Sequence, residues 1–319
     1  MSIFGSWLEF YFDCRNSRLV RQILCKPRLE KRALVAVSNS DERERVSANL
    51  RTRNVLCIAA RDHGYHTMIQ REQMNGKLDR EVEIQRRYYT DTAPCYDRMH
   101  GQEAGDNPQT FKLLCAMLQM ADVKTVLEVG AGTGRGMRRL SEAMPELSVR
   151  GIEPVTALVE QATKKNGVPA GAILQAVGER LPFCDGTFDA VYSLAILHHV
   201  RQPNLIVSEM LRVARRAVII IDGNRFGQGG WPARLLKLGL YKTRLWKIAN
   251  YLKTGGKGYL LTEGDGLAYS YSVYDSFELL AAWSEQLIII PSDPCEATSW
   301  FHPLLTAAGV VVCAVKKTH

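Results

Sequence analysis

The pattern of apolar and polar positions changes near residue 74. Residues 1–73 hold short apolar runs, ALVAV at 33–37 and VLCIAA at 55–60, between clusters of charge, and no helical or strand period persists in them. We therefore expect a poorly defined N-terminal extension over 1–73 and one domain over 74–319. Met68 and Met74 lie close to this boundary, so one interpretation is that the biological start lies there and the upstream residues are accidental.

Within the domain, β-branched runs alternate with segments of helical apolar spacing. The expected strands are 123–130, 149–154, 171–177, the first part of 188–200, 216–222, 287–291 and 310–317. The expected helices are 78–99, 109–120, 136–144, 156–167, 204–215 and 276–286. Such alternation with short links predicts an α/β fold with a doubly wound, mostly parallel, seven-stranded Rossmann-like sheet. No clear crossover helix separates the last two strands, so we expect the final strand to be antiparallel.

An insertion over 223–274 interrupts this alternation. It follows a strand, and such an insertion lies on the ligand side of a parallel sheet. Its segment 231–253 (WPARLLKLGLYKTRLWKIANYLK) has nearly helical apolar spacing with basic residues between. This helix could contact an anionic membrane surface, form a lid whose cations meet a phosphate-bearing substrate, or cover the pocket with its apolar face in the core. The closely spaced tyrosines that follow suit a ring-shaped or carbohydrate substrate or an edge strand: Tyr259, Tyr269, Tyr271 and Tyr274.

Composition narrows the class of protein. Hydrophobic residues make up 46% and charged residues 23%, which is ordinary for a globular chain and excludes disorder throughout. No run of about 18 apolar residues suggests a membrane-spanning helix, and the N-terminal residues read poorly as a signal peptide. The net charge is +8, and residues 223–262 hold eight Lys or Arg and no Asp or Glu. The 8 cysteines are far apart with no CxxC pair, which predicts a cytoplasmic location and no metal site.

A glycine-rich loop follows the first expected strand, in the string VLEVGAGTGRG at 126–136. Glycines at such a turn let a nucleoside-bearing ligand approach the backbone. The dinucleotide spacing GxGxxG fails, because its third glycine would fall on Arg135, and the Walker pattern GxxxxGK[ST] is absent.

Two glutamates indicate the kind of ligand. Glu128 precedes the first glycine of the loop by two residues, where a carboxylate would repel a pyrophosphate and attract an ammonium or a sulfonium. S-adenosylmethionine carries both of these cations. Glu153 lies 21 residues after Gly132, at the end of the next strand, where a carboxylate can accept both ribose hydroxyls.

Four strings in the expected order, EVGAGTG, GIEP, LPFCDGTFDAVYSLAILHHV and SEMLRVARRAVIIID, resemble the class I S-adenosylmethionine-dependent methyltransferases, in particular the small-molecule group that includes the quinone methyltransferases. The resemblance covers about 85–222, and more weakly 275–317. It implies S-adenosyl-L-methionine as cofactor. It implies cofactor contacts at Glu128, Gly130, Ala131, Gly132, Gly134, Glu153, Pro154, Val177, Gly178, Glu179 and Leu194. Many relatives have Asp where this chain has Val177, so the amino group of adenine would need another acceptor.

Candidate catalytic residues lie around this loop. His198 and His199 follow the fourth strand and titrate near neutrality, which suits a base for a hydroxyl nucleophile, although LHHV occurs in relatives with many substrates. Tyr88 is the catalytic candidate of an aromatic helix that the resemblance places over the cofactor, with Tyr89 and Tyr96 close by; a helix packed on the sheet edge is the alternative. Asp222 and Asn224 are expected in the substrate pocket.

These observations predict a methyltransferase that acts on a small-molecule, saccharide or lipid-linked acceptor, with O-methylation favoured over C-methylation. The string Ser193-Leu-Ala-Ile stands where methylases of exocyclic base amines have Asn/Asp-Pro-Pro-aromatic, so nucleic acid is disfavoured as a partner. Two alternatives stay open: an RNA or protein methyltransferase that uses the basic insertion, and a cofactor-binding subunit without turnover. The insertion also predicts peripheral contact of 231–253 with an anionic membrane.

Overall fold

A computed structural model describes residues 80–100, 107–262, 264–293, 295 and 299–316 of the chain. The predicted extension over 1–73 lies outside these residues. The described strands are β1 (Thr125–Val129), β2 (Ser148–Ile152), β3 (Ile173–Leu174), β4 (Phe188–Leu194), β5 (Ala214–Gly223), β6 (Tyr259–Thr262), β7 (Gly266–Tyr269), β8 (Gln286–Pro291) and β9 (Gly309–Val315).

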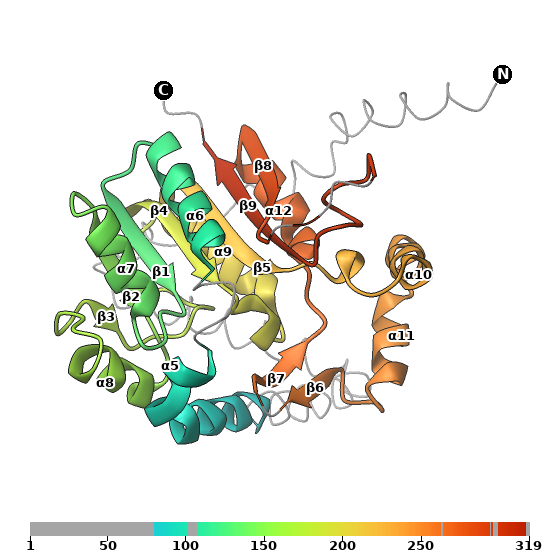
Figure 1. The fold of residues 1–319 in the computed structure, drawn as a ribbon, viewed down its shortest axis with the longest axis horizontal. Helices are drawn as coiled ribbons and strands as arrows, with labels where there is room; N and C mark the ends of the chain where they lie inside the picture. Colours follow the sequence, from blue (N-terminus) through green and yellow to red (C-terminus); the bar gives the residue numbers. More distant parts are fainter. Residues whose placement is uncertain (1–79, 101–106, 263, 294, 296–298, 317–319) are drawn as a thin grey trace, which may run out of the picture. The chain divides into compact units, whose positions relative to one another are not determined.

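The helices surround the larger of two sheets (Figure 1). A first helix covers 80–92. The others are α5 (Tyr96–Met99), α6 (Pro108–Met120), α7 (Arg135–Ala143), α8 (Thr156–Lys164), α9 (Pro203–Val213), α10 (Trp231–Lys242), α11 (Trp246–Lys253) and α12 (Phe277–Trp283). Short 3₁₀ turns are η3 (Ala93–Cys95), η4 (Leu197–His199), η5 (Arg225–Gly227) and η6 (Val273–Ser276).

The seven-stranded sheet confirms the predicted fold. Its order is β3-β2-β1-β4-β5-β9-β8, with parallel pairing from β3 to β5 and antiparallel pairing of β9 with both of its neighbours. The predicted antiparallel final strand is therefore correct. In this order the chain leaves β1 for β2 on one side and β4 on the other, so the loops after β1 and β4 meet at a topological switch point. Ligands of open α/β sheets bind at that point.

Alternate residues of the central strands face two apolar layers. In β5, Val218 and Ile220 pack with α9 and α12, whereas Ile219 and Ile221 pack with α6 and α7. All four side chains are almost fully buried, as a strand covered on both faces requires. The continuous apolar run of β5 is therefore explained by burial on both faces of the sheet.

Some predicted boundaries are wrong. The expected strand over 171–177 contains only the two residues of β3, because β3 lies at the sheet edge and the chain then turns toward the carboxyl ends of the strands. The single helix expected over 231–253 is two helices, α10 and α11, separated at Arg244, which has a left-handed φ of 61°. The tyrosine-rich segment forms the hairpin β6–β7, and β7 contacts η4. No described helix has both the length and the apolar character needed to cross a bilayer.

Candidate functional site

The glycine loop after β1 packs too tightly for side chains at two positions. Gly130 has φ 78°, and a Cβ there would lie 2.7 Å from Cγ2 of Ile196. A Cβ at Gly134, φ 71°, would lie 2.6 Å from Cγ2 of Val168 in the core beneath α7 and α8. Gly134 thus shapes the turn and does not line the cavity above the loop, and its expected role as a cofactor contact stays a prediction.

A cavity of about 290 Å³ lies above this loop. Its walls come from the ends of β1, β2 and β4, from the helix over 80–92 and from η4. Of the expected cofactor contacts it is lined by Glu128, Gly130, Ala131, Gly132, Glu153, Pro154, Val177, Gly178, Glu179 and Leu194. The structure therefore gathers ten of the eleven positions around one space.

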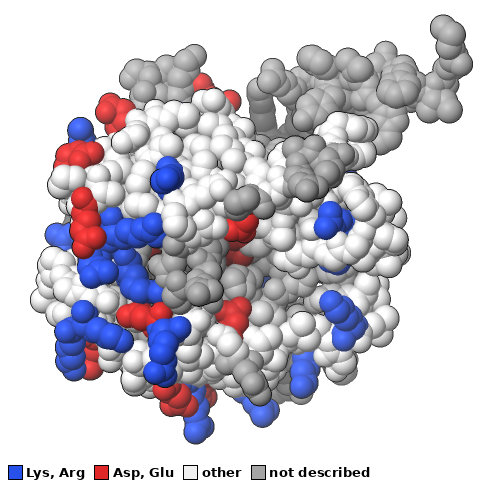
Figure 2. All heavy atoms as spheres, viewed as in Figure 1, with Lys and Arg blue, Asp and Glu red and all other residues white. Residues whose placement is uncertain are grey.

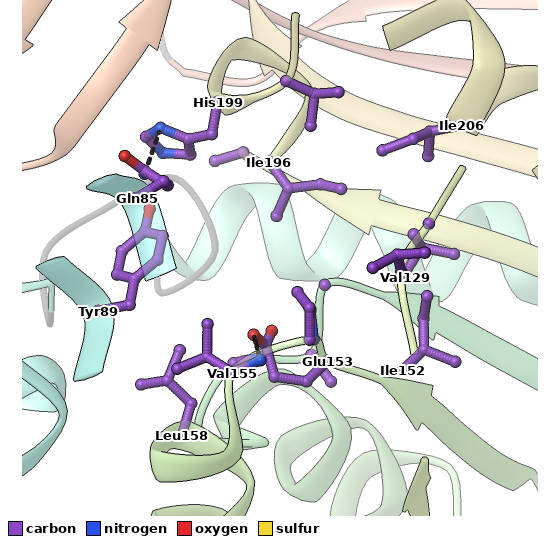
Figure 3. A pocket seen from close by; sticks show the side chains of 18 of the residues that line it. Gln85, Tyr89, Val129, Ile152, Glu153, Val155, Leu158, Ile196, His199 and Ile206 are labelled. Carbon is purple, nitrogen blue, oxygen red and sulfur yellow. Dashed lines mark hydrogen bonds between the residues drawn. The ribbon is translucent and has the colours of Figure 1, made fainter. Parts of the chain in front are cut away.

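Glu153 is held by the backbone of the loop that it faces. Its carboxylate accepts hydrogen bonds from the N–H groups of Gly132 and Val155, each at 2.9 Å. Figure 3 shows the side chain beside Val155, on the side of the cavity opposite His199. Burial raises its pKa to about 7, although both backbone bonds lower it. Each oxygen keeps a second lone pair, so the carboxylate can still accept two hydroxyls.

Glu128 is the second buried carboxyl group of the cavity. It accepts a hydrogen bond of 2.9 Å from the hydroxyl of Tyr192. A Cβ at Gly136 would lie 2.8 Å from its Oε1, so a larger residue there would displace this carboxylate. Burial raises the pKa of Glu128 to about 8. A cation that entered the cavity would offset this cost and favour the ionised form.

The segment after β3 forms a more open part of the wall. Val177 and Glu179 are exposed, whereas Gly178 is buried against Ile206 of α9. A flat apolar group can rest here. Among the described hydrogen bonds, none involves the side chain of Glu179, so it is available as an acceptor for an amino group.

The aromatic residues before the sheet divide between two environments. Tyr89 and Tyr96 line the cavity, with ring centroids 5.8 Å apart, and Tyr89 lies 5.8 Å from the ring of His199. The ring of Tyr96 covers Gly132. Tyr88 instead packs on the backbone of Gly266 in β7 and does not line the cavity. Tyr88 therefore lies away from the cavity, because successive helical residues point in different directions, and its catalytic role stays a prediction.

Both histidines of η4 approach one aspartate of the insertion. Nε2 of His198 lies 3.3 Å from Oδ2 of Asp265, and Nε2 of His199 lies 3.1 Å from Oδ1 of the same residue. Nδ1 of His198 also lies 2.8 Å from Asp222. These carboxylates raise the pKa of His198 to about 10 despite its burial, which favours its protonated form. A role as catalytic base stays a prediction for both histidines.

Asp265 is not predicted by any pattern of the sequence. It lies in the turn between β6 and β7, 66 residues after His199, and only the pairing of this hairpin with η4 brings it to the site. The string Gly264-Asp265-Gly266 predicts a turn, but nothing in it indicates a partner.

A second cavity of about 440 Å³ lies between the end of β5 and the insertion. Ala195 and Tyr269 line both cavities, and His198 and Asp222 line the second one. Asn224 does not line it: its amide donates to the carbonyls of Leu304 and Ala307, so its expected place in a substrate pocket is wrong. The remaining polar lining includes Arg225, Lys253, Asn250, Thr254, Tyr259 and Asp293.

The two insertion helices contain no buried residue. Seven apolar side chains of the segment 231–253 are 43–73% exposed: Trp231, Leu235, Leu236, Leu245, Ile248, Tyr251 and Leu252. Four others are half-buried, namely Leu238, Leu240, Tyr241 and Trp246, and the ring of Tyr241 packs on Phe226. The apolar surface of this segment is thus partly covered and partly open to solvent. Figure 2 shows blue side chains among white ones over these helices, at the right, and no red ones.

Comparison with known proteins places this site in a recognised domain. Residues 127–221, from β1 to the end of β5, match a family described as a methyltransferase domain. An uncharacterized methyltransferase of Mycolicibacterium gilvum (strain PYR-GCK) is 37% identical over 91 residues, which are 28% of this chain and 35% of that protein.

Phosphatidylethanolamine N-methyltransferase of Cereibacter sphaeroides is 30% identical over 108 residues, which are 34% of this chain and 53% of that protein. The chain thus spans about half or less of these relatives. Among solved structures, magnesium protoporphyrin IX methyltransferase from Synechocystis PCC 6803 with bound SAH has a TM-score of 0.48 and 17% identity, covering 74% of this chain and 100% of that one.

Proposed function

We propose that this chain, which carries a methyltransferase domain of the class I S-adenosylmethionine-dependent type over residues 127–221, transfers a methyl group to a hydroxyl of a small-molecule, saccharide or lipid-linked acceptor. The observation that carries the proposal is the pair of buried carboxyl groups, Glu128 and Glu153, on either side of an open glycine loop. Such a cavity favours a ligand with a cation at one end and a diol at the other.

S-adenosyl-L-methionine, the methyl donor, has such a cation at one end and such a diol on its ribose. Its ammonium group lies toward Glu128, and its ribose hydroxyls donate to Glu153. The adenine rests against Val177 and Gly178, with Glu179 as an acceptor for its amino group. Tyr89 and Tyr96 cover the remaining side, which excludes water from the sulfonium.

The reaction needs little beyond alignment. An acceptor oxygen forms a bond to the methyl carbon, the carbon–sulfur bond breaks, and its electron pair returns to sulfur, giving S-adenosylhomocysteine. The hydroxyl proton must also leave. The second cavity adjoins the first at Ala195 and Tyr269, so an acceptor held there approaches the donor beside His199 and Asp265.

The insertion provides a surface for lipid. Its exposed apolar side chains stand among exposed cations, Lys242, Arg244, Lys247, Lys253 and Lys257, with no acidic residue in 223–262. Apolar insertion and attraction to anionic headgroups strengthen each other at a membrane interface. A relative named phosphatidylethanolamine N-methyltransferase supports a lipid acceptor, while its name concerns transfer to nitrogen and not to a hydroxyl. We therefore propose a cytoplasmic protein with peripheral contact with an anionic membrane.

Vesicle binding tests this surface. The protein should sediment with vesicles that contain phosphatidylserine but much less with pure phosphatidylcholine. The variant Leu252→Ser/Ile248→Ser should lose most of this binding, whereas Leu205→Ser, an exposed apolar residue on α9, should not. Equal sedimentation of the wild type with both vesicles would contradict the lipid surface.

Transfer of labelled methyl groups tests the acceptor class. The protein is incubated with methyl-labelled S-adenosylmethionine and fractionated cell extract, and the label is followed into organic-soluble, polysaccharide, small polar, nucleic-acid and protein fractions. Label in the first three fractions supports the proposal, and alkali-stable label in the product supports an ether. Label in nucleic acid or protein contradicts it, and donor binding without any label would favour a subunit without turnover.

A further inference from the structure

His198, His199 and Asp265 form a compact set of donor atoms that the methyl-transfer chemistry above does not require. One donor atom from each residue lies within 4.8 Å of the others. Nε2 of His198 lies 3.3 Å from Oδ2 of Asp265 and Nε2 of His199 lies 3.1 Å from Oδ1, so both rings turn this nitrogen toward the same carboxylate. The side chains are between 10% and 37% exposed, so solvent can supply an ion.

The outer nitrogens of both rings are already engaged. Nδ1 of His198 lies 2.8 Å from the buried carboxylate of Asp222, and Nδ1 of His199 lies 2.8 Å from the carbonyl oxygen of Leu267. The carboxylate of Asp222 accepts, so the ring of His198 donates its Nδ1–H outward. Nδ1 of His199 also lies 3.2 Å from the side-chain nitrogen of Gln85. Both rings turn Nε2 toward Asp265. A carboxylate or carbonyl behind each ring is the usual support of a metal-binding histidine.

The carboxylate of Asp222 is itself held in place by backbone hydrogen bonds. It is 5% exposed and accepts from the backbone N–H groups of Leu197 and Gly223 at 2.9 and 2.7 Å. The ring of His198 is thus oriented by a carboxylate that the end of β5 holds rigidly, while His199 is oriented by β7. β5 and the hairpin β6–β7 thus bring the three side chains together.

The group of His198, His199 and Asp265 lies between the two cavities. His199 and Asp265 line the glycine-loop cavity, whereas His198 lines the second cavity. An ion held by the three residues would therefore border both the donor and the acceptor of the proposed reaction.

We infer that His198, His199 and Asp265 form a binding site for a divalent first-row transition ion, with Zn²⁺ the best match. Two imidazoles and one carboxylate suit Zn²⁺ and its neighbours in the series, whereas Mg²⁺ and Ca²⁺ prefer oxygen ligands throughout. Three protein ligands leave at least one coordination position open, as in catalytic rather than structural zinc sites.

The role of this ion rests on the proposed function. An acceptor hydroxyl that occupied the open position would become more acidic and release its proton to water, and the oxygen would then attack the methyl carbon. An acceptor with two adjacent hydroxyls would suit such an ion, since both oxygens could bind it.

Metal binding can be measured without donor or acceptor. The full-length protein is treated with a chelator, freed of it, and titrated with Zn²⁺ and with Co²⁺, whose visible absorption reports the ligand geometry. Asp265→Asn and His198→Gln remove ligands, Asp222→Asn removes only the support behind His198, and His302→Gln is the control, since His302 contacts Thr306 instead. The chain has further Cys and His residues, for example Cys57 and His63, so the comparison with the variants isolates this site.

The wild type and His302→Gln should bind one more equivalent of Zn²⁺ than Asp265→Asn or His198→Gln, and Zn²⁺ should raise their melting temperature more. Asp222→Asn should keep the site with about 10–100-fold weaker affinity. Equal stoichiometry and equal Zn²⁺-dependent melting shifts for the wild type and Asp265→Asn would overturn the inference. S-adenosylhomocysteine binding, measured separately, would then still test the donor site, so the two proposals fail independently.

Discussion

At the scale of single residues, the cavity above the glycine loop, the proposed donor cavity, contains two carboxyl groups whose burial makes ionisation costly. Glu128 is 3% and Glu153 5% exposed, and their pKa values are raised to about 8 and 7. A raised carboxyl pKa means that the folded protein without ligand binds more protons than the unfolded chain. This contribution to stability is fully present below about pH 4.5 and is lost as pH rises to about 8.

Donor binding should release protons through Glu128. The ammonium of S-adenosylmethionine favours the ionised carboxylate, so affinity should rise as pH rises from 6 to 8, by at most about tenfold per pH unit for one linked proton. Calorimetry in buffers of different ionisation enthalpy measures the protons released. Glu128→Gln should lower affinity and abolish this share of the release; an unchanged release would contradict the assignment of Glu128.

Replacing Glu153 should weaken donor binding. Two hydrogen bonds to a charged acceptor contribute about 1.5–3 kcal/mol each, so Glu153→Ala should raise the Kd at least tenfold. The same change leaves the N–H groups of Gly132 and Val155 without their partner, so melting temperature must be measured alongside. Glu160→Ala on the exposed face of α8 is the control and should change neither quantity. Unchanged affinity of Glu153→Ala would remove the ribose assignment.

At the scale of elements, hydrogen bonds join three segments around the cavity: the helix over 80–92, the residue Arg201 after η4, and β7. Glu81 in the helix over 80–92 accepts two hydrogen bonds from Arg201, at 2.6 and 2.7 Å, and one of 2.6 Å from the hydroxyl of Tyr269. Gln85 of the same helix accepts from the backbone of Leu267 in β7. The helix and the hairpin, which lie together at the lower edge in Figure 1, therefore depend on each other for their positions.

Removing the hydrogen bonds of Glu81 should loosen the contact between the helix over 80–92 and the hairpin β6–β7, which together cover the donor cavity. Glu81→Gln should lower stability by about 1–2 kcal/mol, since Arg201 is partly solvated, and should speed donor release. Hydrogen exchange should increase in 80–92 and 266–269. Arg87→Gln on the same helix breaks only an exposed pair with Asp91 and should leave exchange and release unchanged. Equal hydrogen exchange and equal donor release in the two variants would show that the hydrogen bonds of Glu81 do not hold the helix over the cavity.

At the scale of the whole molecule, the sheet, the helix over 80–92 and the insertion together enclose two adjoining cavities. Every described residue that lines either cavity lies between Glu81 and Gly309. Residues 1–73 lie outside the described residues, so a shortened chain tests whether they contribute to the donor site.

A chain that begins at Met74 should bind S-adenosylhomocysteine with the affinity of the full-length protein, within about twofold. It should also unfold at a similar temperature, because the apolar layers on both faces of the sheet remain complete. Calorimetry and thermal unfolding of both chains test this. Loss of donor binding would show that residues 1–73 belong to the working protein.

The sequence by itself determined the fold and most of the donor cavity. Apolar periodicity is a local property, so the strands and helices that alternate from β1 to β5 could be predicted, and with them the loop that carries Gly130 and Gly132. Glu128 and Glu153 could be found because strand ends and the glycine loop fix where they lie. The weakest boundaries were those of β3 and of α10 and α11, where pairing at a sheet edge and solvent exposure, rather than periodicity, set the ends.

Only the tertiary structure decided which side chains meet at the junction of the two cavities. The partnership of His198 and His199 with Asp265 depends on a hairpin returning to η4, and no local pattern encodes that contact. Tyr88 and Tyr89 are adjacent in sequence, yet one packs on β7 and the other faces the donor cavity. Local sequence sets conformation along a segment, whereas long-range packing sets which of its faces meets a distant partner, and this packing decides the chemistry of the site.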